Sequence, residues 1–166
     1  PAELVAKYDM IMEAAGRHIR QIPDDKLGGK ILDRDRTYRE LTYHIFRIAE
    51  ALMDTASGAE LTVSYYHDNP PADMQTVEQI ASFGEDVRSR LNAWWEAYPH
   101  KNGEALVNTY FGNKPLHEVL ERSTWHSGQH GRQIVMAMGE FMGIAADNPL
   151  TADDYAGLPM PEKAWD

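Results

Sequence analysis

The sequence predicts an all-α protein: a four-helix bundle with long crossover loops that occupies residues 1–166 as a single domain. Apolar residues recur at spacings of three and four in four separate segments, which is the periodicity of helices that bury one face. Strand-like alternation of useful length is lacking, although residues 61–65 could pair briefly. Connections of about 14 to 18 residues separate the segments, and such lengths favour a bundle that is not simply up-down-up-down.

The first two helices have recognisable ends. The apolar spacing predicts a helix over residues 2–22, and Pro23 ends it because proline offers no backbone amide hydrogen. Thr37 and Glu40 form a capping-box pattern, in which each side chain accepts a hydrogen bond from the other residue's amide. This pattern opens the second helix, which we expect to end near Gly58.

The last two helices carry similar signals. A second capping-box pattern begins at Thr76, and the helix that follows is expected to stop at Pro99. Pro115 suits the first turn of a helix, so the fourth helix is predicted from there to about Gly143. The remaining tail is expected to contain one short helical turn at residues 152–156.

Composition excludes several classes of function. The chain has 26 acidic and 16 basic residues and a formal net charge of −10, which disfavours nucleic acid or an anionic membrane as a partner. It has no cysteine, so disulfides, cysteine nucleophiles and cysteine-bound zinc are excluded, and any reacting thiol must arrive with a substrate. Apolar runs of about 18 residues and a signal-peptide core are both lacking, so a cytoplasmic protein is expected.

Two histidines on the fourth helix suggest a metal site. His126 and His130 are four residues apart, so both side chains leave the same face of the helix. Because a buried imidazole without hydrogen-bond partners costs about 1–3 kcal/mol, two adjacent ones strongly favour a shared ligand. The apolar stripe that contains them is formed by Leu116, Val119, Ser123, Ser127, Ile134, Ala137 and Phe141.

A third histidine completes a possible ligand set. His44 lies on the apolar stripe of the second helix, one turn before Ile48. Three imidazoles from two helices would leave at least one coordination position of an ion open, which is the pattern of catalytic rather than structural metal sites. The alternative is three core histidines that form hydrogen bonds with their neighbours.

Further candidates lie close to these ligands. Tyr66 and His67 belong to the second long loop and could lie over the metal as catalytic residues that move a proton, or they could belong to an exposed turn. Gln133, one turn beyond His130, could orient its ring or a bound water. Glu40 lies one turn before His44, but capping is its more probable role.

These residues resemble the DinB/YfiT family of metalloenzymes. The resemblance rests on His44, on the pair His126 and His130, on the Gly131-Arg132-Gln133 that follows, and on the terminal Leu158-Pro159-Met160-Pro161. Many family members have His-Arg-Gly-Gln where this chain has His130-Gly131-Arg132-Gln133. Related maleylpyruvate isomerases commonly carry glutamate at the position of His126, so the chain looks closer to the DinB and bacillithiol-transferase branch.

The resemblance implies a down-up-up-down four-helix bundle, usually a homodimer, with nickel, zinc or manganese bound by His44, His126 and His130. It implies a transferase that joins a low-molecular-weight thiol to small electrophilic or xenobiotic substrates. A metal-dependent hydrolase of small molecules is the first alternative. The second is a non-catalytic, metal-binding dimeric bundle, in which the histidines stabilise the fold or sense metal.

Overall fold

The structure, a computed structural model, describes residues 1–32 and 34–165, and its helices confirm the all-α class. The helices are α1 (Ala2–Ile19), α2 (Tyr38–Ala56), α3 (Val77–Ala97) and α4 (Leu116–Phe141). Short 3-10 helices are η1 (Asp24–Lys26), η2 (Val63–His67) and η3 (Ala152–Tyr155). An antiparallel hairpin of β1 (Leu106–Thr109) and β2 (Gly112–Pro115) precedes α4. Among the described helices, none is both long and apolar enough to cross a membrane.

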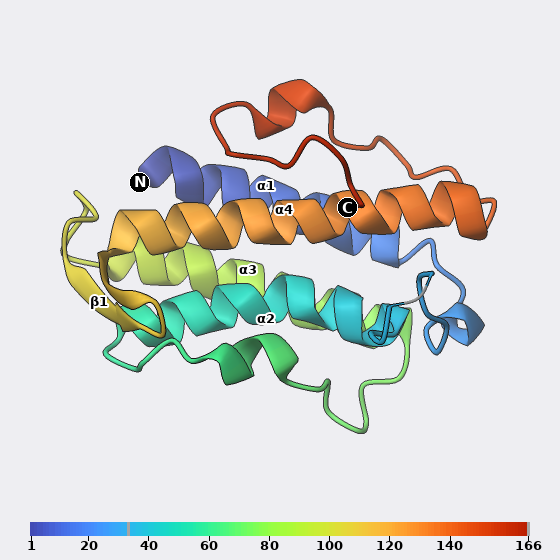
Figure 1. Cartoon of the computed structure of the whole chain (residues 1–166), viewed down its shortest axis with the longest axis horizontal. Helices are drawn as coiled ribbons and strands as arrows, with labels where there is room; N and C mark the ends of the chain where they lie inside the picture. The colour runs from blue at the N-terminus through green and yellow to red at the C-terminus, as the bar shows by residue number, and fades with distance from the viewer. Residues whose placement is uncertain (33, 166) are drawn as a thin grey trace.

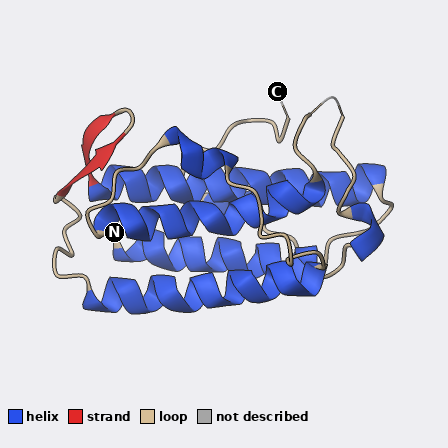
Figure 2. Ribbon diagram, turned by 90° about the horizontal axis from the view of Figure 1, so that it is seen from below, coloured by secondary structure: helices blue, strands red, loops and turns tan. Residues whose placement is uncertain are grey.

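The helices form a bundle in which α1 and α2 each pack against both α3 and α4. In Figure 1, α1 and α4 run in one direction and α2 and α3 in the other, which is down-up-up-down connectivity. Because α2 and α3 are parallel, the chain between them must return along the whole length of the bundle. That crossover, residues 57–76, carries η2 past α2, and Figure 2 shows the hairpin at one end of the bundle.

Both predicted capping boxes are present. The amide of Glu40 donates to Thr37 Oγ1 at 3.1 Å and the amide of Thr37 to Glu40 Oε1 at 3.2 Å. Thr76 and Gln79 form the same reciprocal pair at the start of α3. These bonds satisfy amides that the first helical turn leaves without partners, so they fix where α2 and α3 begin.

Three details of the prediction were wrong. Helix α1 ends at Ile19 rather than at residue 22, because the next residues form tighter turns before Pro23. The hairpin was missed, since its strands are short and hold no regular apolar alternation. The brief pairing expected within residues 61–65 is present as an isolated bridge between Leu61 and Thr109. Phe141 is 47% exposed, because the last turns of α4 extend beyond the other helices (Figure 1).

A buried hydrogen-bond chain joins three of the helices. The Tyr8 hydroxyl on α1 lies 2.7 Å from Ser127 Oγ on α4, and Ser127 Oγ donates to the carbonyl of Ile45 on α2 at 2.8 Å. Tyr8 and Ser127 are fully buried. Since an unpaired polar group costs free energy there, this chain fixes the rotation of α4 relative to α2.

Helices α3 and α2 pack closely at Gly84, where the buried ring of Phe46 fills the space that a β-carbon would need. We therefore expect Gly84→Ala to lower the free energy of unfolding by about 1–3 kcal/mol through overpacking. Gly139→Ala is the control, because that glycine is exposed on α4 with no atom near the added methyl, and alanine should stabilise there by about 0.5–1 kcal/mol. Urea unfolding measures both, and equal effects would contradict the packing argument.

Candidate metal centre

Helices α2 and α4 bring the three predicted histidines together. The ring centroids lie 5.8 Å apart for His44 and His126, 5.1 Å for His44 and His130, and 4.8 Å for His126 and His130. One ring nitrogen of each lies within 4.8 Å of those of the other two. This spacing is close enough that modest ring rotations would let all three bind one ion, so the cluster could hold a metal.

One fully buried nitrogen of this cluster has no hydrogen-bond partner among the described residues. His130 Nδ1 lies 2.8 Å from Gln133 Oε1, which accepts its hydrogen and leaves Nε2 with a free lone pair. That Nε2 is buried, and no residue that the structure describes forms a hydrogen bond with it. A buried polar atom without a partner is costly unless it binds something, so the residues fit a metal ion. The prediction that Gln133 orients a ring agrees with this contact.

The site keeps its imidazoles neutral. Burial lowers the pKa of His126 to about 4 and the pKa of His130 to about 3, and it lowers the pKa of His44 even further. The positive charge of Arg36 lowers the pKa of all three rings as well. Neutral imidazoles are the form that binds metal, so the ligands need no deprotonation at neutral pH.

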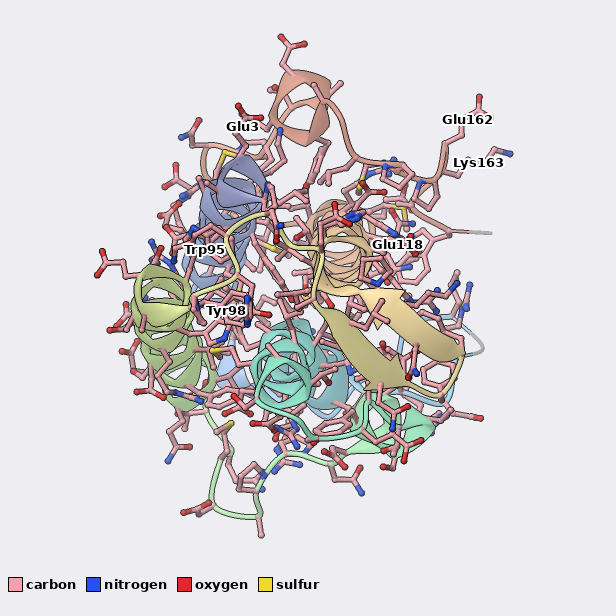
Figure 3. The ribbon with its side chains drawn as sticks, turned by 90° about the vertical axis from the view of Figure 1, so that its left-hand side faces the viewer. Glu3, Trp95, Tyr98, Glu118, Glu162 and Lys163 are labelled. Atoms are coloured by element: carbon pink, nitrogen blue, oxygen red, sulfur yellow. The ribbon has the colours of Figure 1, made fainter. Side chains whose placement is uncertain are left out.

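The C-terminal tail accepts hydrogen bonds from side chains of α4 next to the three histidines. Gln133 Nε2 donates to the carbonyl of Ala164 at 3.0 Å, which holds the amide in the orientation that His130 requires. Arg132 on the same helix donates to the carbonyl of Pro161 at 2.7 Å. The side chains of Glu162 and Lys163 point away from the bundle (Figure 3), so the tail binds α4 through its backbone.

A cavity of about 420 Å³ opens onto the histidines. His44 and His130 line it directly, while His126 contacts the ring of Trp125. The cavity is large enough for a small molecule but is not closed. Its lining comes from the start of α2, the crossover, α4 and the tail: Ile31, Arg34, Asp35, Arg36, Glu40, Leu41, His44, Tyr66, His67, Asp68, His130, Gln133 and Trp165.

The crossover brings Tyr66 and His67 to this cavity. The Tyr66 ring stacks on His126 with centroids 5.5 Å apart and meets His44 edge-on at 5.8 Å. Burial raises the pKa of the Tyr66 hydroxyl. His67 is exposed and lines the cavity wall. Both residues therefore lie at the site, and their catalytic role remains a prediction.

Arg36 and Trp165 are among the lining residues that the sequence analysis did not identify. Arg36 immediately precedes the capping residue of α2, and Trp165 belongs to the tail. No local pattern marks either one, because their place at the cavity depends on how distant segments fold back.

The remaining histidines lie outside the cluster. His18 is buried and its Nε2 lies 2.8 Å from the carbonyl oxygen of Asp147, so it joins α1 to the tail. His100 is exposed and His117 half-buried. Gly128 packs closely against α1 and the tail, whereas a β-carbon at Gly131 would have no described atom within 4 Å.

Comparisons with known proteins support the fold. Neither the protein-family models nor the curated proteins give a match to this sequence. Among solved structures, a DinB-like protein from Bacillus cereus is similar, with a TM-score of 0.69 and 15% identity over 87% of this chain and 93% of that one. A mycothiol-dependent maleylpyruvate isomerase is similar with a TM-score of 0.55 and 20% identity over 76% of this chain and 58% of that one. The chain therefore has the DinB-like fold.

The lowered pKa values predict how stability depends on pH. Below the ordinary imidazole pKa of 6.5, the unfolded chain takes up protons that the buried rings of His126 and His130 refuse until about pH 4 and pH 3. The metal-free protein should therefore lose stability as the pH falls from about 6.5 toward 4, by at most about 1.4 kcal/mol per pH unit for each ring. Urea midpoints of chelator-treated protein between pH 7.5 and pH 5 measure this.

Replacing the exposed His100 by glutamine should leave that slope unchanged, whereas His126→Phe should make it shallower. A stability that is equal at pH 7 and pH 5 would contradict the burial of neutral imidazoles.

Proposed function

We propose that this protein is a divalent-metal-dependent enzyme that transfers a low-molecular-weight thiol onto a small electrophilic substrate. The observation that carries the proposal is the buried Nε2 of His130, which has no partner and belongs to a cluster of three neutral imidazoles. Two of these ligands line a cavity of about 420 Å³, which is sized for a small molecule.

The residues have distinct roles in this proposal. His44, His126 and His130 hold the ion, and Gln133 fixes the ring of His130. A divalent ion with three neutral ligands keeps its full charge and favours the thiolate form of a thiol at its open position. Imidazole ligands suit zinc and nickel, and manganese is the third candidate.

The thiol must come from outside, because the chain has no cysteine. In the reaction a sulfur–carbon bond forms, the bond from that carbon to its leaving group breaks, and the thiol proton leaves with that group or passes to solvent. His67 is exposed on the cavity wall, where it would accept that proton. Tyr66, whose raised pKa keeps its hydroxyl protonated, would donate a hydrogen bond to the substrate in place of its present contact with Tyr110. The name of one structural neighbour, a mycothiol-dependent enzyme, supports thiol chemistry.

Hydrolysis of a small molecule at the same site is the alternative enzymatic reaction, and a non-catalytic metal-binding bundle is the second alternative. A cytoplasmic homodimer remains the expected form of the protein. The net charge of −10 continues to disfavour nucleic acid and anionic membranes as partners.

Metal binding is tested by elemental analysis and titration of protein purified without an affinity tag. We expect about one divalent ion per chain and loss of that ion in His126→Ala and His130→Ala. Gln133→Leu should weaken binding by about 10- to 100-fold, because His130 loses the acceptor that orients it. His117→Ala, a half-buried histidine outside the cluster, is the control. Unchanged affinity in His126→Ala would refute the ligand assignment.

Thiol transfer is tested with cobalt-substituted protein, because thiolate binding changes the visible spectrum of cobalt. Low-molecular-weight thiols should alter that spectrum, and a thiol-transfer screen should detect turnover. His130→Ala should abolish both while helical circular dichroism is retained. Tyr66→Phe and His67→Ala should reduce the rate without releasing the metal. If no thiol alters the spectrum, the transferase proposal fails; turnover of esters or amides would then favour hydrolysis.

A further inference from the structure

We propose that Arg36 is the anion-binding residue of this cavity and that it holds a carboxylate on the molecule whose reacting atom lies at the three histidines. This inference rests on the proposed function and narrows its substrate class to small anionic molecules. We base it on the position of Arg36, on the lack of an ion pair to Arg36 among the described residues, and on the charges of the side chains that line the cavity.

Arg36 is placed at the mouth of the metal site by two segments. It directly precedes Thr37, the capping residue of α2, and the helix continues to His44 two turns later. Its Nη2 donates to the carbonyl of Tyr66 at 2.8 Å, which ties the start of α2 to the crossover. Arg36, His44 and His130 all line the same cavity. A ligand in that cavity can therefore reach the guanidinium and the histidines together.

The guanidinium has unused donors. It carries five N–H groups, and one hydrogen bond, to the Tyr66 carbonyl, is formed. Among the residues that the structure describes, no carboxylate lies within 4.0 Å of it. Other arginines are better matched: Arg47, Arg88 and Arg90 each pair with acidic side chains. Arg36 is thus a half-buried cation with no ion pair within 4.0 Å among the described residues, and the charge of Glu40 acts on it only from farther away.

Nearby acidic groups are engaged elsewhere or exposed. Glu40 Oε1 accepts from the amide and the hydroxyl of Thr37. Asp68 accepts from Arg47 at 2.9 Å. Asp35 also lines the cavity, but it is exposed, so water screens its charge. The inner part of the cavity therefore presents Arg36 and neutral imidazoles, which favours an anion.

The guanidinium of Arg36 is partly removed from water by burial. Burial lowers the pKa of Arg36, which means that its charge is poorly solvated where it lies. A planar carboxylate could accept two parallel hydrogen bonds from the guanidinium and replace the missing water. Hydrogen bonds to charged groups contribute enough to raise affinity by about ten-fold or more.

Two thiols of equal chain length test the proposal: 3-mercaptopropionate carries a carboxylate, and 3-mercapto-1-propanol carries a neutral hydroxyl. Their dissociation constants are measured from the spectrum of the cobalt-substituted protein. We expect about ten-fold or greater preference for 3-mercaptopropionate, and loss of that preference in Arg36→Gln, with binding of the neutral thiol retained. Arg36→Lys should keep part of it, because lysine retains the charge but not the planar pair of donors.

Arg39 supplies the matched control. It also lies at the start of α2 and binds the crossover, donating to the carbonyls of Met74 at 2.7 Å and Pro71 at 2.6 Å, but it does not line the cavity. Arg39→Gln should therefore leave the thiol preference unchanged. If Arg36 only anchored the crossover, both arginine variants would weaken the two thiols equally, which would overturn the proposal.

A second measurement separates this proposal from the thiol chemistry. Propionate, which has no thiol, is titrated into metal-free protein against sodium chloride of equal ionic strength, and the Arg36 Nε–Hε signal is followed by nuclear magnetic resonance. A saturable shift specific to propionate supports the anion site even if neither thiol changes the cobalt spectrum. The same shift without a thiol preference assigns the carboxylate to the electrophile. A preference that survives in Arg36→Gln, or no shift and no preference, overturns the proposal.

Discussion

The buried hydrogen-bond chain from Tyr8 through Ser127 to the carbonyl of Ile45 is the constraint on which the candidate metal site depends. Ser127 directly follows His126 on α4, and Ile45 directly follows His44 on α2. A rotation of either helix that separated these histidines would also break a fully buried hydrogen bond, which costs free energy because no water replaces it. The bundle therefore fixes the ligand geometry before any metal binds, and preorganisation of this kind favours both affinity and selectivity.

The burial that orders the three histidines also lowers the stability of the protein when no ligand is bound to them. Low polarity keeps the pKa of His126 near 4 and that of His130 near 3, so the rings remain neutral at physiological pH. Gln133 accepts a hydrogen bond from Nδ1 of His130, while Nε2 of the same ring has no partner among the described residues. The free energy of unfolding is thus lower than an apolar core would give, and binding of an ion to these histidines would raise it again. Sites that trade stability for binding in this way are typical of function rather than of packing.

Much of this architecture could be predicted from the sequence because it depends on local patterns. Capping boxes at Thr37 and Thr76 depend on neighbouring residues, and the spacing of His126 and His130 follows from helical geometry. The hairpin could not be predicted, since its pairing depends on the turn and on packing against the end of the bundle. Arg36 and the tail were missed for the same reason: each reaches the cavity through contacts between residues far apart in the chain.

Two walls of the cavity, the crossover and the C-terminal tail, are attached to the bundle through backbone carbonyls. Arg36 binds the carbonyl of Tyr66, and Gln133 binds the carbonyl of Ala164. Carbonyls are available whatever side chain a position carries, so the path of the crossover and of the tail is held while most of their residues are free to vary. Chemical selectivity then rests with the few side chains that face inward, above all Arg36, whose charge favours anions over neutral molecules at an otherwise unchanged metal centre.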